Sequence, residues 1–365
     1  MSPSGSGSPT VARDEPVVAA GCTRSVLMVG NFTPADRSYR QVCDELAVRL
    51  GDSGWEVHTT SARAARLPRL AEMVATVWRR RHHFAAAYVE VFSGPAFCWA
   101  EAVCWALRRT RKPYVLALHG GNLPAFSGRW PGRVGRLLGS ARTVTAPSRY
   151  LREGLRRFRE DIQVIPNPLD IAAYGFRPRE QLRPRIIWLR AFSSIYNPSL
   201  AIRVLARLAV EFPEVRLTMI GPDKRDGSLD QTRRIAAELG VLDRVDWTGG
   251  VPKADVPSRL GAGDLFLNTS NVDNTPVSVL EAMACGMCVV STNVGGVPFL
   301  LQHEVDSLLV PPNDSRAMAG AVRRILTEPD LAGRISRNAR LRVESFDWAV
   351  ILPRWDSLLS GLVGR

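Results

Sequence analysis

A segment in the second half of the chain combines a helix start with nearby carboxylates. Thr275 is a good N-cap residue and Pro276 suits the first helical position, so the pattern predicts a helix over residues 276–285. The backbone amides of Val277 and Ser278 then lie free at the helix N-terminus, where anions commonly bind. The segment therefore predicts an anion site.

Two carboxylates flank this predicted anion site. Glu281 lies one turn into the helix, and its side chain leans toward the helix N-terminus. A carboxylate beside a bound phosphate can accept hydrogen bonds from a neighbouring diol, and phosphate with vicinal hydroxyls describes a nucleotide. Asp273 precedes the helix and can hold another hydroxyl. From the spacing alone, a capped core helix with a solvated Glu281 fits equally well.

Further candidate residues follow predicted strands. His119 follows an apolar run at 113–118, and Gly120 and Gly121 after it allow a backbone to approach a ligand closely. Arg190 follows a second apolar run, RIIWL. A histidine on a loop is more often structural, so sequence alone gives His119 no firm role.

The elements that must position these residues alternate along the chain. Short apolar runs, such as residues 25–29 and 216–221, alternate with helical patterns, such as those at 198–212 and 229–239. This order predicts an α/β protein with two doubly wound Rossmann-like domains facing a central crevice, where ligands bind at the carboxyl ends of the strands. The expected parts are a flexible tail (1–23), an N-terminal Rossmann-like domain (24–172), a hinge (173–182), a C-terminal Rossmann-like domain (183–345), and a C-terminal helix (346–365) that packs back on the N-terminal domain.

The charge is concentrated in the first half of the chain. The net charge is +13, and residues 1–170 carry 24 basic and 14 acidic side chains. An anionic partner, such as a membrane surface, a phosphorylated substrate or nucleic acid, explains this excess; an arginine-rich composition explains it equally well. Residues 64–83 predict an amphipathic helix that ends in Arg79, Arg80 and Arg81. Such a helix can lie on an anionic membrane, or it can face the core with a solvated basic end.

Several classes of protein lose support. The first 20 residues lack a basic start and an apolar core, so they do not resemble a signal peptide. The apolar stretch 84–107 carries Glu90 and Glu101 and predicts a strand and a helix instead of a membrane span. No dinucleotide or P-loop glycine motif and no metal-ligand cluster is present, and Cys285 and Cys288 are expected to be a packing pair. A cytoplasmic protein, peripheral on the inner face of the membrane, fits best.

The motifs together resemble a known family. The spacing of Asp273 and Glu281, the continuation EAMACGMCVVSTNVGGVP and the later LLVPPND are similar to the donor site of family 4 retaining glycosyltransferases (glycosyl transferases group 1), which have the GT-B fold. The segments HGGNLP, APSRYL, IPNPLD, LRAFSSIYNP and GPDK occur in the expected order. The resemblance covers nearly all of the chain after residue 24, and it implies that the N-terminal domain (24–172) lies on the acceptor side and that the C-terminal domain (183–345) binds the donor nucleotide.

The resemblance implies roles for the donor-side residues. Glu281 binds the ribose, Asp273 contacts the transferred sugar in place of the usual Glu, and His119 lies beside that sugar. Arg190 contacts the donor diphosphate, whereas the family lysine that follows it is missing near Tyr196. Lys224 is the expected substitute. The remaining residues expected on the donor side are Gly221, Thr275, Pro276, Val277 and Ser278.

The acceptor side departs from the family more strongly. The first strand is followed by GNFTPADRS, where the family often has paired glycines. The residues expected on this side are Gly30, Asn31, Gly120, Gly121 and Asn122.

The implied activity is metal-independent and needs no cofactor: a sugar passes, with retention, from a nucleotide-sugar donor to a glycan, a lipid-linked acceptor or a small molecule. Because the family lysine is missing, a catalytically weak relative that binds nucleotide sugar is an alternative. A basic nucleic-acid-binding protein is the alternative from another class, but no nucleic-acid motif supports it.

Overall fold

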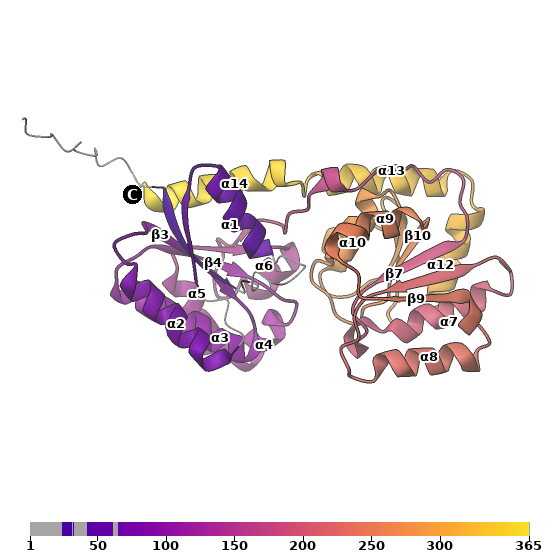
Figure 1. Ribbon diagram of the computed structural model, residues 1–365, viewed down its shortest axis with the longest axis horizontal. Helices are drawn as coiled ribbons and strands as arrows, with labels where there is room; N and C mark the ends of the chain where they lie inside the picture. The colour runs from indigo at the N-terminus through magenta and orange to yellow at the C-terminus, as the bar shows by residue number, and fades with distance from the viewer. Residues whose placement is uncertain (1–23, 31, 33–41, 61–64, 365) are drawn as a thin grey trace, which may run out of the picture.

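Two α/β domains lie side by side in the computed structural model, which describes residues 24–30, 32, 42–60 and 65–364 (Figure 1). Each domain has a six-stranded sheet, all of whose described pairings are parallel, with helices on both faces. This confirms the predicted fold class. The expected tail (1–23) and Asn31 lie outside the described residues.

The N-terminal sheet has the order β2-β1-β3-β4-β5-β6. Its strands are β1 (Ser25–Val29), β2 (Glu56–Thr59), β3 (Ala86–Val91), β4 (Tyr114–Leu118), β5 (Thr143–Ala146) and β6 (Gln163–Val164). Its helices are α1 (Val42–Asp52), α2 (Arg66–Arg79), α3 (Phe97–Arg109), α4 (Leu123–Arg129), α5 (Pro131–Ser140) and α6 (Arg149–Leu155). β1 pairs with β2 on one side and with β3 on the other. The strand order therefore reverses between β1 and β3, which is where ligands commonly bind in such sheets.

The C-terminal sheet repeats this plan in the order β12-β11-β10-β7-β8-β9. Its strands are β7 (Arg185–Leu189), β8 (Arg216–Ile220), β9 (Val245–Gly249), β10 (Leu265–Asn268), β11 (Cys288–Thr292) and β12 (Leu308–Val310). The helices are α7 (Pro198–Leu208), α8 (Ser228–Glu238), α9 (Val256–Gly261), α10 (Val277–Ala284), α11 (Val297–Leu300), α12 (Ser315–Thr327) and α13 (Leu331–Glu344). Here the strand order reverses between β7 and β10.

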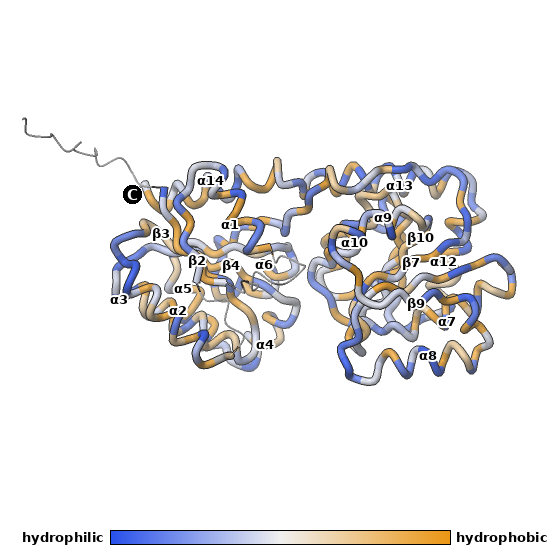
Figure 2. The backbone as a smooth tube through the Cα atoms, in the orientation of Figure 1, coloured by the Kyte–Doolittle hydropathy of each residue, from blue (hydrophilic) through white to orange (hydrophobic). Residues whose placement is uncertain are grey.

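Buried apolar residues fill both faces of each sheet. In the C-terminal domain, alternate residues of β7 point to opposite cores: Ile186 and Trp188 lie in one cluster, and Ile187 lies in the other. Figure 2, which colours each residue by its hydropathy, shows apolar residues along the strands. Cys285 and Cys288 are buried in these cores, and burial raises the pKa of each thiol, to about 11 and about 12. Both therefore stay protonated near neutral pH.

The last helix, α14 (Trp348–Val363), crosses back from the C-terminal domain and runs along the N-terminal domain (Figure 1). Its Trp348, Ile351, Trp355 and Leu359 lie in the same buried cluster as Val26 of β1. The Trp55 indole donates a hydrogen bond to Asp356 at 2.7 Å. The C-terminus of the chain thereby completes the core of the N-terminal domain.

Some helix boundaries differ from the sequence-based prediction. The helix expected over 198–212 ends at Leu208. The expected helix over 64–83 becomes α2, which ends at Arg79. Of the apolar residues of this helix, Met73 and Val77 are buried, but Leu67 is 80% exposed and Trp78 is 38% exposed.

Candidate active site

Arg190 and Asp273 meet where the strand order of the C-terminal sheet reverses. Arg190 directly follows β7, and its backbone amide donates to the Ile220 carbonyl of β8 at 3.0 Å. Asp273 lies on the loop after β10, the other neighbour of β7. The Arg190 guanidinium donates to Asp273 Oδ2, with the two side chains 16% and 12% exposed. Two strands therefore bring a fixed cation and a carboxylate to one edge of the sheet.

The loop that carries Asp273 is held by close backbone packing. Asp273 Oδ2 also accepts from Ser270 Oγ at 3.1 Å, and Oδ1 accepts from the Asn274 amide at 2.9 Å. A Cβ at Gly295 would lie 2.1 Å from the Asp273 carbonyl oxygen, and one at Gly296 would lie 2.0 Å from the Asn274 carbonyl oxygen. The paired glycines of TNVGGVP are thus required for the loop to lie against this segment.

Gly221 allows an equally close approach on the other side of Arg190. Its φ is +151°, and a Cβ there would lie 1.7 Å from the Arg190 carbonyl oxygen. Gly221 therefore lets the end of β8 pack beside Arg190, and its expected place on the donor side stays a prediction.

The N-terminus of α10 lies just beyond Asp273, but its cap differs from the predicted one. Pro276 is the N-cap residue and the helix starts at Val277, so the prediction of Thr275 as N-cap is wrong. The reason is that Pro276 has the extended backbone (ψ 110°) of a residue outside the helix. The Oγ atoms of Thr275 and Ser278 are buried without a hydrogen-bond partner among the described residues. The first amides of α10, those of Val277 and Ser278, have no acceptor one turn earlier in the helix.

Glu281 is buried and lies beside two polar groups that sequence reasoning missed. It is 4% exposed, accepts a hydrogen bond from the Tyr174 hydroxyl at 2.9 Å, and pairs with Lys253 through the same oxygen, Oε1. Burial, and then the charge of Glu281, raise the pKa of Tyr174 well above its usual range, so the phenol stays protonated and donates. Glu281 is therefore not a solvated residue on a core helix.

The signal for Lys253 was present in the sequence. It follows β9, whose carboxyl end lies at the same edge of the sheet as those of β7 and β8. Tyr174 lies in the segment between the domains, where no periodic pattern marks it.

Lys224 lies on an exposed loop after β8. Its amide donates to the Phe192 carbonyl at 3.1 Å, which holds the loop two residues beyond Arg190. The family lysine is missing near Tyr196, and the Arg190 guanidinium lies 4.7 Å from the centre of the Tyr196 ring. The substitution of the family lysine by Lys224 stays a prediction.

The N-terminal domain presents His119 at the end of β4. Its Nε2 lies 3.4 Å from Glu90 Oε1 and 3.4 Å from the Tyr88 hydroxyl, and its ring stacks on Phe92 at 5.2 Å. Glu90 lies at β3, where its carboxylate is 5% exposed. The His119 ring is therefore held on three sides.

The two domains touch beside these residues. A Cβ at Gly121 would lie 3.5 Å from the Asn274 amide, and Ser148 Oγ donates to Asn274 Oδ1 at 2.5 Å. The loop from His119 to Gly121 thus lies against the loop of Asp273. Asn122 is exposed and lines a different hollow with Phe126, so the structure does not bring it to this contact.

A cavity of about 860 Å³ opens between the domains. Thr275 and Phe299 line one wall, and Ser148 and Arg149 line the other. Apart from Thr275, none of the described residues predicted for the site lines this cavity. Within the described part of the chain, no group of three or more His, Cys, Asp or Glu residues could hold a metal ion.

Family models match both domains. Residues 177–342 match Glycosyl transferases group 1, and residues 40–173 match Glycosyltransferase Family 4. The chain is 25% identical over 293 residues to the D-inositol 3-phosphate glycosyltransferase of Acidothermus cellulolyticus, covering 73% of this chain and 62% of the relative. For the enzyme of the same name from Thermobispora bispora, the identity is 25%, over 85% of this chain and 86% of the relative.

Solved structures of similar fold cover nearly the whole chain. HepE of Anabaena, in complex with UDP and glucose, matches with a TM-score of 0.73 and 21% identity over 92% of this chain and 99% of that chain. Sucrose-phosphate synthase of Thermosynechococcus elongatus matches with a TM-score of 0.76 and 18% identity over 93% of this chain and 99% of that chain. The two family models match the two domains in order. The structure also brings the ends of β7 and β10 together and packs Gly295 and Gly296 against the Asp273 loop. The chain therefore belongs to the group 1, or family 4, glycosyltransferases of GT-B fold.

Proposed function

We propose that this glycosyltransferase moves a sugar with retention from a nucleotide-sugar donor to an acceptor bound by the N-terminal domain. The observation that carries the proposal is the arrangement at the carboxyl edge of the second sheet. A fixed cation (Arg190), the free amides of a helix start (α10) and a buried carboxylate (Glu281) lie on segments that follow the neighbouring strands β7 and β10. These groups match a diphosphate and a ribose.

The diphosphate lies against Arg190 and the first amides of α10. Arg190 has donor capacity to spare, because its contact with Asp273 uses one nitrogen and its buried Nε has no partner among the described residues. The ribose hydroxyls donate to Glu281, which Tyr174 and Lys253 hold in place through Oε1.

The transfer step needs no covalent intermediate on the protein. The bond between the anomeric carbon and the diphosphate oxygen breaks, and its electron pair leaves with the nucleoside diphosphate. The acceptor oxygen bonds to the anomeric carbon on the same face, and its proton passes to the departing phosphate. Arg190 and the α10 amides stabilise the charge that develops on that phosphate.

A catalytically weak donor-binding protein is the second candidate. It is favoured by one observation: near the point where the family lysine is missing, the ring of Tyr196 packs on Arg190. Turnover measurements separate the two, because this candidate binds nucleotide sugar without releasing the nucleoside diphosphate.

We expect activity without a divalent metal or another cofactor. The full chain is incubated with UDP-, GDP- and ADP-sugars, and it should release the nucleoside diphosphate from one of these donors. The rate of release in excess EDTA should equal the rate in buffer, because fixed cations and helix amides stabilise the charge of the leaving group. Release that stops in EDTA and returns with Mg²⁺ or Mn²⁺ would contradict this.

We further propose a cytoplasmic enzyme that binds reversibly to the anionic inner face of a membrane. No helix of the described residues is long and apolar enough to cross a bilayer. The exposed rings of Trp78 and Trp105 lie 6.4 Å apart on neighbouring helices α2 and α3, and Arg109 lies 5.6 Å from the Trp105 ring. Exposed aromatic rings beside arginines are typical of interfacial binding.

The arginines at the end of α2 should account for much of that binding. Replacing Arg79, Arg80 and Arg81 together with serine is expected to weaken binding to phosphatidylserine-containing vesicles by about 3 kcal/mol, since each contributes about 1 kcal/mol near the surface. Co-sedimentation measures this, and binding should fall with salt.

The matched control replaces three exposed arginines of the other domain, Arg203, Arg234 and Arg316, with serine. If both triple variants lose the same binding affinity, the effect comes from net charge and not from the end of α2. If the wild type binds neutral vesicles equally well, the binding is nonspecific adsorption.

A further inference from the structure

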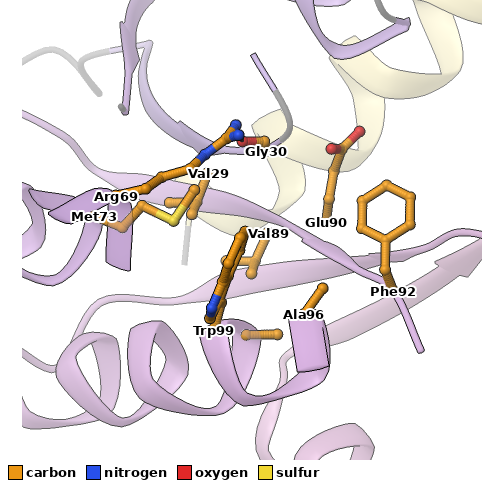
Figure 3. Close-up of a pocket in the computed structure, with 10 residues that line it drawn as sticks. Val29, Gly30, Arg69, Met73, Val89, Glu90, Phe92, Ala96 and Trp99 are labelled. Atoms are coloured by element: carbon orange, nitrogen blue, oxygen red, sulfur yellow. The ribbon is translucent and has the colours of Figure 1, made fainter. Parts of the chain in front are cut away.

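The N-terminal domain holds an apolar pocket beside its own strand reversal, where β1 and β3 lie side by side (Figure 3). Its volume is about 180 Å³. We call this cavity the Trp99 pocket. Its apolar wall consists of Val29, Met73, Val89, Ala96, Trp99 and Ala100. A cavity of about 150 Å³ with such walls holds a molecule of benzene, so this pocket has room for one six-membered ring.

One nitrogen of a polar side chain in this pocket lacks a hydrogen-bond partner among the described residues. Arg69 reaches in from α2 above Trp99 and is 9% exposed (Figure 3). Its Nη2 donates to the Gly30 and Phe32 carbonyls at 3.3 and 3.5 Å, while its buried Nε has no partner among the described residues. A buried donor without a partner is costly, and an oxygen on a bound molecule would satisfy it.

The other polar side chain of the pocket connects it to the reaction centre. Glu90 rises from β3 toward Gly30 (Figure 3), and its Oε1 lies 3.4 Å from His119 Nε2. His119 begins the loop that packs, through Gly121, against Asp273 and Asn274. Glu90 and His119 thus link the Trp99 pocket to the loop of Asp273.

We propose that the Trp99 pocket binds the acceptor, and that this acceptor is a largely apolar six-membered ring that carries one or two hydroxyl groups. The inference rests on the proposed transferase function and names its acceptor class. The ring lies between Val89, Met73 and Trp99, one oxygen accepts from Arg69 Nε, and a hydroxyl faces Glu90. A ring with a hydroxyl on every carbon fits poorly, because most of its hydroxyls would be buried against apolar walls without partners.

Two ring alcohols of the same carbon skeleton test this class. Cyclohexanol has one hydroxyl, and myo-inositol has six. In ligand-observed NMR with the full chain, cyclohexanol is expected to bind at least tenfold more tightly than myo-inositol. Equal binding, tighter binding of myo-inositol, or no binding of either one overturns the inference.

Variants place the binding in this pocket. Ala96→Trp, at a partly exposed lining position, should fill the pocket and weaken cyclohexanol binding at least fivefold. Trp99→Ala should weaken it as well, while the control Trp130→Ala should leave it unchanged because Trp130 is 43% exposed and outside the pocket. Unchanged binding in Ala96→Trp and Trp99→Ala contradicts the inference.

Nucleotide binding by the same variants separates the two claims. Since the pocket lies in the other domain, UDP or GDP affinity should be unchanged in Ala96→Trp and Trp99→Ala, which also shows that they fold. If the wild type binds neither nucleotide, the transferase proposal fails. If it binds a nucleotide but not cyclohexanol, only the acceptor class fails.

Discussion

Replacing Arg190 with methionine is expected to lower kcat by about 100- to 1000-fold, the usual cost of removing one preorganised donor to a developing negative charge. The Nη2 and Nε groups of Arg190 lie at the strand reversal, with Nε buried and unpartnered among the described residues. The contact strengthens as the phosphate leaves, so kcat should fall far more than donor affinity. Steady-state kinetics with the preferred nucleotide sugar measures both.

The fold should survive this change. Asp273 keeps its hydrogen bonds from Ser270 and from the Asn274 amide. The matched control is Arg207→Met, at an exposed arginine of α7 whose Nε donates to Ser315. It should retain wild-type kcat. Equal loss in both variants, or a normal kcat in Arg190→Met, would remove Arg190 from the mechanism.

Lys224 and Lys253 enter the same kinetic comparison. If Lys224 replaces the family lysine on the diphosphate, Lys224→Ala lowers kcat by about 100-fold with an intact fold. Lys253, which pairs with Glu281, should act on donor affinity instead. If Lys224→Ala has a normal kcat while Arg190→Met has a low one, Lys224 does not replace the family lysine. Arg190 and the α10 amides alone would then stabilise the leaving group.

Replacing Glu281 with alanine is expected to weaken nucleotide-sugar binding by at least about 1.5 kcal/mol, which is about tenfold, because a buried charged acceptor of ribose hydroxyls is lost. Lys253 is 47% exposed and can return to solvent when its partner is removed, so the change should not strand a buried cation. Calorimetric titration with the donor measures the affinity.

The control for Glu281 is Glu211→Ala, which removes a carboxylate that is 43% exposed and paired with Arg323 on the far side of the same domain. Its donor affinity should match that of the wild type. Unchanged affinity in Glu281→Ala would take Glu281 out of the nucleotide site and return it to a structural role beside Tyr174.

The sequence predicted much of the fold because its signals are local. Apolar runs such as RIIWL and helical patterns alternate so regularly that both sheets could be anticipated, as could the placement of Arg190 after β7. Gly286, which follows α10 in the sequence, has a φ of +74° and lies where a side chain would strike the Arg177 carbonyl oxygen, so a glycine is needed at this helix end.

The rest depends on contacts between distant segments. Tyr174 and Lys253 are 107 and 28 residues from Glu281 along the chain, and no local pattern joins them. The cap at Pro276 is decided by how the Asp273 loop packs on Gly295 and Gly296, which propensity cannot show. The Trp99 pocket likewise forms only when α2 and α3 pack on the same face of the sheet.

Hydrogen–deuterium exchange of the full chain, with and without UDP, GDP or ADP, tests most directly whether a nucleotide lies at the proposed place. One of these nucleotides should slow exchange in peptides covering residues 189–197 and 273–285, while α2 and α3 exchange as in the free protein. Protection confined to the basic N-terminal domain, or no protection by any of the three, would contradict a nucleotide-sugar site built from Arg190, α10 and Glu281.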